Sequence, residues 1–306
     1  MKRFAVVALV VASVLSGAGV AAAEKPLNVV ATLSPFADLV KTIGDGHVEV
    51  TCIASPKFNP HFIEPKPSDV LSVKRAELLV HAGLDLEAWR GPLIDASGNP
   101  NVRPNGPNQL DLSQGIPLLE VPTSAVSRSQ GDIHLFGNPH YWLGPPNAVI
   151  MARTISAKLS EVDAAHKADY EKNLADFQKQ LEAKMAEWKT KMKPFEGKEI
   201  IGYHNEWPYL MEFLGLKMDK FLEPKPGVPP TPKQIEYLQQ YMTEKGVKVI
   251  VQPSYFPTKA AQELAKRVNG QAILLCQGVG ENSESKDYIS MIDYDVNTLI
   301  QALQKG

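Results

Sequence analysis

Short apolar runs alternate with helical patterns along the first half of the chain. Four runs have the composition of buried strands, at 27–34, 48–55, 76–83 and 116–121. Helix-compatible segments at 35–43 and 67–75 separate the earlier runs. Because strands that alternate with helices form βαβ units, we expect a mainly parallel sheet here. The stretch 95–115 is rich in Asn, Pro and Gly, which predicts a long surface loop.

The middle of the chain has the pattern of one long helix. From Asn147 to about Met192 it contains no proline or glycine. Apolar side chains recur there every three or four positions, at Tyr170, Leu174, Phe177, Leu181, Met185, Trp188 and Met192. Two prolines before this segment suit the first turn of a helix, and Pro194 ends it.

The second half repeats the alternation. Strand candidates lie at 197–204, 247–254 and 271–277, and helical segments near 205–214, 232–244, 257–268 and 286–304. We therefore predict an α/β protein with two lobes, each with a mainly parallel sheet, joined by a long backbone helix. The expected boundaries are 24–145 for the first lobe, 146–194 for the connecting helical segment and 195–306 for the second lobe. A ligand site is expected in the cleft between the lobes.

The first 23 residues have the composition of a secretory signal peptide. Lys2 and Arg3 precede an apolar stretch that ends in three alanines before Glu24. No later run approaches the ~20 apolar residues of a membrane span. We therefore expect an exported protein, in the bacterial periplasm. The formal net charge of -2 argues against nucleic acid as a partner.

The chain has two cysteines, Cys52 and Cys276. An exported protein can form a disulfide from such a pair. Because the two cysteines belong to different predicted lobes, we expect them to remain unpaired.

Three of the seven histidines stand where a ligand site is expected. His61 follows the run 48–55, His204 ends the run 197–204, and His140 precedes the long helix. Ligands of open α/β sheets bind beyond the carboxyl ends of the strands. Three neutral imidazoles make a good zinc site, so these residues are candidate metal ligands. Their wide separation in sequence also fits independent surface histidines. The remaining histidines have ordinary surroundings: we expect His47 in a turn, His81 in a buried strand and His166 on a solvated helix.

Motifs of common enzyme classes are missing from the sequence. It has no G-x-G-x-x-G after a strand, no G-x-x-x-x-G-K-[ST], no H-E-x-x-H, no C-x-x-C and no G-x-S-x-G. We therefore do not expect an enzyme. One alternative is a zinc-dependent hydrolase with an open three-histidine site and Glu206 as general base. Another is a metal-independent adhesin or receptor on the same fold.

Three segments of the sequence match known motifs. The segment "NPHFIEPKPSD" (59–69) resembles a D-P-H-x-[YF]-E-P-x-P-S-D loop. The segment "GNPHYWLGPPNA" (137–148) is similar to N-P-H-x-W-L-D-P, and "YHNEWPYLMEFLGL" (203–216) is similar to H-x-A-F-x-Y-L…G-L. In these motifs the chain resembles the zinc- and manganese-binding periplasmic receptors of ABC transporters, the cluster A-I metal receptors. The resemblance runs from about residue 27 to 303, in the family's order.

The resemblance implies a metal ion held between the lobes by His61, His140 and His204. A histidine at 204, where many manganese-binding members carry glutamate, resembles the zinc branch. It implies Zn²⁺, with Mn²⁺ or another divalent transition metal as the alternative. The implied partner is the membrane permease of an ABC importer, and a periplasmic metallochaperone is a second candidate. We expect a monomer.

The sequence departs from the family's pattern in three places: at Cys276, at Gly144 and around His134, where the histidine-rich acidic loop of many zinc receptors is missing. Most members supply an aspartate as fourth ligand, and that position falls here on Cys276, or on Gln277 after a shift of one. Cys276 is the candidate fourth ligand, with Gln277, His134 and water as alternatives. Gly144 replaces the aspartate of W-L-D-P, so the following helix loses its usual cap. Glu64 is expected to support the His61 loop rather than to bind metal.

Overall fold

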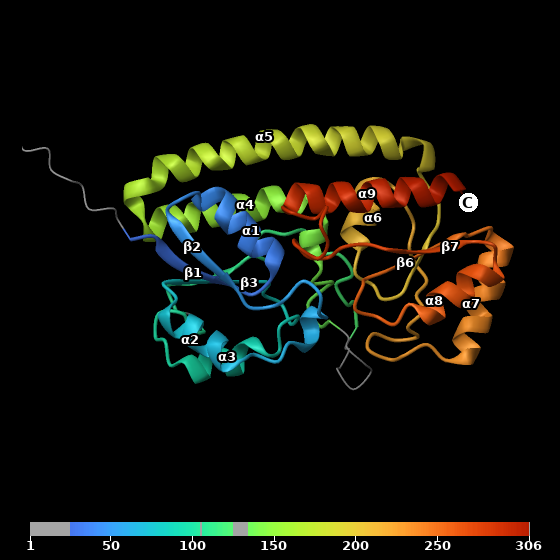
Figure 1. The fold of residues 1–306 in the computed structure, drawn as a ribbon, viewed down its shortest axis with the longest axis horizontal. Coiled ribbons are helices and arrows are strands. Elements are labelled where there is room, and N and C mark those ends of the chain that lie inside the picture. Colours follow the sequence, from blue (N-terminus) through green and yellow to red (C-terminus); the bar gives the residue numbers. More distant parts are fainter. Residues whose placement is uncertain (1–24, 105, 125–133, 306) are drawn as a thin grey trace, which may run out of the picture.

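Two α/β lobes lie side by side in the computed structural model, and one long helix, α5 (Lys167–Met192), runs over both of them (Figure 1). The structure describes residues 25–104, 106–124 and 134–305. The predicted signal peptide, residues 1–23, lies outside these ranges. Among the described helices, none combines the length and the hydropathy needed to cross a bilayer.

The first lobe contains a parallel sheet of four strands in the order β2-β1-β3-β4. The strands are β1 (Leu27–Ala31), β2 (Val48–Cys52), β3 (Leu78–His81) and β4 (Gln109–Asp111). Helix α1 (Ser34–Gly44) covers one face, and α2 (Pro67–Arg75) and α3 (Arg90–Ser97) cover the other (Figure 1). Alternate residues of β1 pack into different clusters, Val29 beside α1 and Val30 beside α2 and α3. This alternation is the two-residue period of a strand that is buried on both faces.

The prediction for residues 95–121 was wrong in part. The fourth strand is Gln109–Asp111, within the expected loop, and 116–121 forms no strand. Its backbone is paired differently at Leu119, whose N–H donates to the Tyr209 hydroxyl (3.1 Å) and whose carbonyl accepts from Asn138 N (2.8 Å). The apolar run is therefore an anchor for the segment around His140.

The middle of the chain forms two helices instead of one. Helix α4 (Pro145–Val162) ends at Asp163, a short 3₁₀ turn follows (Ala164–His166), and α5 (Lys167–Met192) runs back over both lobes (Figure 1). Asp163 leaves the helical conformation with φ −138°, and its carboxylate accepts hydrogen bonds from Tyr170 Oη (2.5 Å) and His166 Nδ1 (2.8 Å). Neither proline nor glycine marks this break, so the helical pattern concealed it.

The second lobe contains a parallel sheet in the order β5-β6-β7. The strands are β5 (Ile201–Gly202), β6 (Val249–Gln252) and β7 (Gln271–Leu274). The helices are α6 (Pro208–Leu214), α7 (Pro232–Lys245), α8 (Lys259–Arg267) and α9 (Tyr288–Lys305). These elements confirm the predicted order of strands and helices in this half, with shorter strands.

The largest apolar core is continuous between the lobes. It joins side chains of the first sheet and α1 to those of α4, α5, α6 and α9. The Tyr288 hydroxyl of α9 donates to the Trp142 carbonyl (2.6 Å), next to the start of α4. A shared core of this kind restricts how far the lobes can separate. Cys52 and Cys276 are both free, as predicted.

Candidate metal centre

Three buried histidines meet at the junction of the lobes. Potential ligand atoms of His61, His140 and His204 all lie within 4.8 Å of one another. Their exposed fractions are 6%, 0% and 5%. His61 lies in a 3₁₀ turn after β2 (Pro60–Phe62), and His140 directly precedes another (Tyr141–Leu143). His204 follows β5, so two strand ends and the segment before α4 bring together the three residues that the sequence analysis selected.

Two asparagines orient His61 and His140 in the same way. The Asn59 side-chain oxygen accepts from the backbone N of His61 (3.0 Å) and lies 2.7 Å from its Nδ1. The Asn138 oxygen accepts from the backbone N of His140 (3.0 Å) and lies 3.0 Å from its Nδ1. Each Asn-Pro-His segment thus fixes both the backbone and the ring of its histidine. The repeat of these three letters in the sequence was the signal for this role.

A carboxylate orients the third ring. His204 Nδ1 lies 2.7 Å from Glu223 Oε2, and both side chains are buried. In each of the three rings, Nδ1 lies beside an oxygen that can accept a hydrogen bond. We therefore assign the ring proton to Nδ1. Nε2 then carries a lone pair in each ring. His140 Nε2 is buried without a hydrogen-bond partner, which is the arrangement expected of a metal ligand.

A fourth histidine lies at the edge of this group. His134 Nε2 is 3.2 Å from His61 Nε2, and the His134 ring centroid is 5.7 Å from that of His140. His134 Nδ1 lies 3.1 Å from Asp85 Oδ1, so its ring is oriented like the other three. Two nitrogen ligands of a tetrahedral zinc ion are about 3.3–3.4 Å apart, given Zn–N bonds of about 2.0–2.1 Å. The His61–His134 distance is close to that value.

Burial keeps the central imidazoles neutral. Desolvation lowers the pKa of His61 and His140 well below the usual range for histidine, and the neighbouring imidazoles lower the pKa further. Neutral rings at neutral pH do not need to release a proton before they bind a cation.

Within the described ranges, neither His134 nor Cys276 belongs to the group of ligand atoms within 4.8 Å of one another, and Cys276 forms no hydrogen bond with any of the three histidines. Cys276 lies in the shared apolar core, and Asn282 Nδ2 donates to its Sγ (3.1 Å). Burial raises the pKa of the Cys276 thiol, which disfavours the thiolate that zinc binds. Glu64 is exposed, and Asn59 performs the orienting role at His61.

The glycine at 144 is required by close packing. A Cβ atom there would lie 2.7 Å from Tyr209 Cβ. Tyr209 in turn donates its hydroxyl to the Asn138 carbonyl (2.7 Å). Helix α4 begins without a side-chain cap, as expected. The missing side chain at Gly144 leaves room for the Tyr209 ring, which supports the His140 segment.

Comparisons with known proteins agree with this geometry. The family model for the periplasmic zinc-uptake complex component A (ZnuA) matches residues 29–302. The chain belongs to this family. Its fold and its class are therefore those of the metal-binding receptors of ABC importers.

Among the proteins similar to this chain, some are named for zinc and others for manganese. The high-affinity zinc uptake system protein ZnuA of Bacillus subtilis is 27% identical over 282 residues, 90% of this chain and 88% of that protein. The manganese ABC transporter substrate-binding lipoprotein PsaA of Streptococcus mitis is 25% identical over 306 residues, 97% of this chain and 96% of that protein. A crystal structure of ZnuA matches with a TM-score of 0.76 at 23% identity, covering 91% of this chain and 99% of that one.

Proposed function

We propose that this protein captures one Zn²⁺ outside the cytoplasm and delivers it to the permease of an ABC importer. The observation that carries the choice of metal is the donor set, in which imidazole nitrogens converge from His61, His140 and His204. Imidazole suits zinc, whereas manganese prefers carboxylate, carbonyl and water oxygens. The family supplies the transport role, and the N-terminal signal pattern supplies the compartment.

His134 is the proposed fourth ligand. Its Nε2 faces Nε2 of His61, and the oxygen beside Nδ1 of each ring favours the tautomer with the proton on Nδ1. Two lone pairs at 3.2 Å repel unless a cation lies between them. A zinc ion relieves this repulsion and completes a tetrahedron of four nitrogens. The buried thiol of Cys276 is a weaker candidate.

The hydrolase alternative loses support at Glu206. The side chain is fully buried, and the Tyr255 hydroxyl donates to its Oε1. Burial raises the pKa of Glu206 well above the usual range for a carboxyl group, which disfavours its charged form. A fully enclosed carboxyl group that is already hydrogen-bonded to Tyr255 is a poor candidate for a general base. Capture and handover of the ion fit the site better than turnover.

Metal competition tests the proposal. The mature chain, stripped by a chelator, is titrated with Zn²⁺ and with Mn²⁺ against a competing chelator, and its metal content is measured by elemental analysis. We expect one tightly bound Zn²⁺ per chain and weak binding of Mn²⁺. The His204→Ala variant should lose zinc binding, and His47→Ala, on a distant surface, should retain it. Equal or tighter binding of Mn²⁺ would overturn the choice of metal.

A further inference from the structure

One loop of the first lobe contacts three of the four histidine segments. This template loop, residues 82–90, connects β3 to α3. Its Asp85 lies 3.1 Å from His134 Nδ1 and also accepts from Leu135 N (2.9 Å). Its Trp89 donates Nε1–H to the carbonyl of Pro60 (2.8 Å), the residue before His61.

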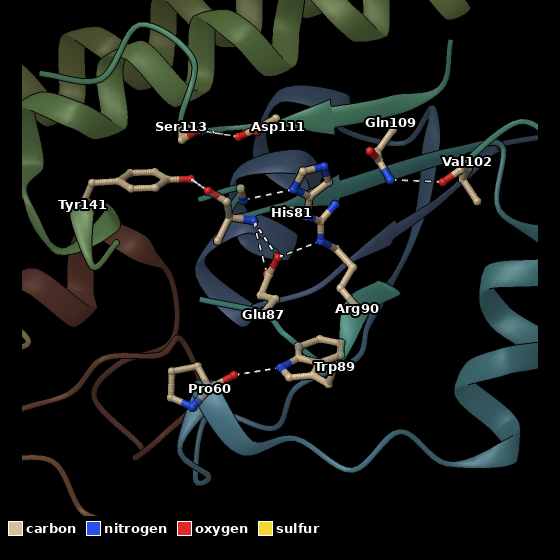
Figure 2. A network of polar contacts seen from close by, with 12 residues as sticks. Pro60, His81, Glu87, Trp89, Arg90, Val102, Gln109, Asp111, Ser113 and Tyr141 are labelled. Atoms are coloured by element: carbon tan, nitrogen blue, oxygen red, sulfur yellow. Dashed lines mark hydrogen bonds and ion pairs between the residues drawn. The ribbon is translucent and has the colours of Figure 1, made fainter. Parts of the chain in front are cut away.

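The third contact reaches the residue after His140. The Tyr141 hydroxyl donates to the Ala82 carbonyl at 2.7 Å, a bond that crosses from the His140 segment to the template loop (Figure 2). The loop thus contacts His134 directly and holds a residue adjacent in sequence to each of His61 and His140. Its conformation therefore sets the spacing of these three rings.

A single buried carboxylate holds the template loop in shape. Both Glu87 oxygens accept from Ala82 N, each at 3.2 Å, and Arg90 Nε lies 3.4 Å from Oε2 (Figure 2). Ala82 is therefore held by Glu87 through its N–H and by Tyr141 through its carbonyl. Glu87 is 5% exposed. An ion pair buried to this degree adds little net stability over an apolar replacement, so geometry is the better reason for its presence.

The backbone between Ala82 and Glu87 is strained. Gly83 has φ +68°, and a Cβ there would lie 1.9 Å from an Asp111 carboxylate oxygen. Leu84 also has a positive φ, 50°, which carries a conformational penalty of about 1–2 kcal/mol for an L-residue with a side chain. Strained backbone persists where the surrounding contacts hold it, and such positions gather at functional sites.

We infer that Glu87 is a positioning residue of the metal centre, which holds the template loop so that His61, His134 and His140 converge on one ion. This role rests on the proposed zinc site. A ligand set needs placement within about 0.5 Å, and support of this kind is typically worth about 10–100-fold in metal affinity.

The test compares Glu87→Ala and Glu87→Gln with Asn99→Ala. Asn99 is a buried polar residue of the same lobe, and its Nδ2 donates to the carbonyls of Val73 and Ala76, outside the template loop. Three quantities are measured for the mature chain: Zn²⁺ affinity by chelator competition, the visible absorption of bound Co²⁺, and the melting temperature. The cobalt spectrum reports the coordination geometry and not the stability of the fold.

We expect Glu87→Ala to weaken zinc binding by about 10–100-fold and to change the cobalt spectrum. Glu87→Gln keeps one acceptor for Ala82 N and should recover part of both properties. Asn99→Ala should lower the melting temperature but keep the wild-type affinity and spectrum. Wild-type affinity and spectrum in Glu87→Ala would overturn the inference, as would equal losses in Asn99→Ala.

Two milder variants secure the test if Glu87→Ala does not fold. Tyr141→Phe removes only the hydrogen bond to Ala82, and Trp89→Phe removes the one to Pro60 together with part of the buried ring. Each should weaken zinc binding, and wild-type binding in both would overturn the inference. If the wild-type chain itself bound neither Zn²⁺ nor Co²⁺, the proposed function would fall and the role of Glu87 with it. Unchanged variants of a zinc-binding wild type would overturn only the role of Glu87.

Discussion

His134 Nε2 lies 3.2 Å from His61 Nε2, although 73 positions separate the two residues in the chain. The other ring nitrogen of each histidine already faces an oxygen, from Asp85 and Asn59 respectively. When both rings are neutral with the proton on Nδ1, the short approach has no proton to form a hydrogen bond. The proposed zinc ion gives it a physical reason.

This relationship predicts that His134→Ala removes a ligand and not merely a neighbour. We expect a loss of zinc affinity of at least about 100-fold, the upper end of what an outer-shell partner contributes. Cys276→Ser should bind zinc like the wild type, because Sγ of Cys276 accepts a hydrogen bond from Asn282 in the core and lies outside the histidine group. Chelator competition measures both variants. The reverse pattern, with a large loss only in Cys276→Ser, would make the cysteine the fourth ligand.

The two Asn-Pro-His segments predict matched effects in the two asparagines. Asn59→Ala and Asn138→Ala each remove the oxygen that holds a ring at Nδ1. Each should weaken zinc binding by about 10–100-fold. Replacement of either asparagine by aspartate keeps an acceptor oxygen in place and should preserve most of the affinity. Isothermal titration against a competing chelator distinguishes these cases, and equal affinities of the alanine and aspartate variants would contradict the orienting role.

The sequence predicted the residues that follow strands better than those in irregular segments. His61 and His204 could be selected because apolar runs end just before them, and the motifs supported both. His134 follows a stretch without periodicity, and its place is set by Asp85, a contact that no local pattern shows. Contacts of this kind, between residues distant in sequence, become visible only when the chain is folded.

Two further differences have the same origin. The break at Asp163 depends on side-chain hydrogen bonds from His166 and Tyr170, which a helical pattern cannot show. His47 and His166 were expected to be unremarkable, yet their rings stack with centroids 3.8 Å apart. They lie in different segments, before β2 and after α4, so only the folded chain brings them together.

Gly144 gives a prediction about stability. Gly144→Asp would restore the residue that the family motif carries, but its Cβ would lie 2.7 Å from Tyr209 Cβ. We expect the free energy of unfolding to fall by about 1–3 kcal/mol, the usual effect of overpacking. Gly91→Ala is the control, because a Cβ there meets nothing within 4 Å, and in helix α3 it should leave stability unchanged or raise it by up to about 1 kcal/mol. Urea denaturation measures both, and an equally stable Gly144→Asp variant would show that Tyr209 can move aside.

A carboxylate between the lobes predicts a pH dependence of stability. Asp38 of α1 accepts from the backbone N of Tyr288, the first residue of α9, at 2.8 Å. The pKa of Asp38 is raised from 3.8 to about 6. Burial is the largest cause and the charge of Asp287 adds to it, while the Tyr288 N–H and Lys41 partly offset the increase. The folded protein therefore holds this proton more tightly than the unfolded chain does.

The sign follows from that difference in proton binding. Below about pH 4 Asp38 is protonated in both states, and its ionisation destabilises the fold progressively as the pH rises to about 6. Over this range Asp38 should lower the free energy of unfolding by about 3 kcal/mol at most, at 1.36 kcal/mol per pKa unit. Asp38→Asn keeps an oxygen for Tyr288 N but cannot ionise. The difference in unfolding free energy between variant and wild type should therefore grow from pH 4 to pH 6 and then level off. A difference that stays constant with pH would mean that Asp38 ionises as readily in the folded protein as in the unfolded chain.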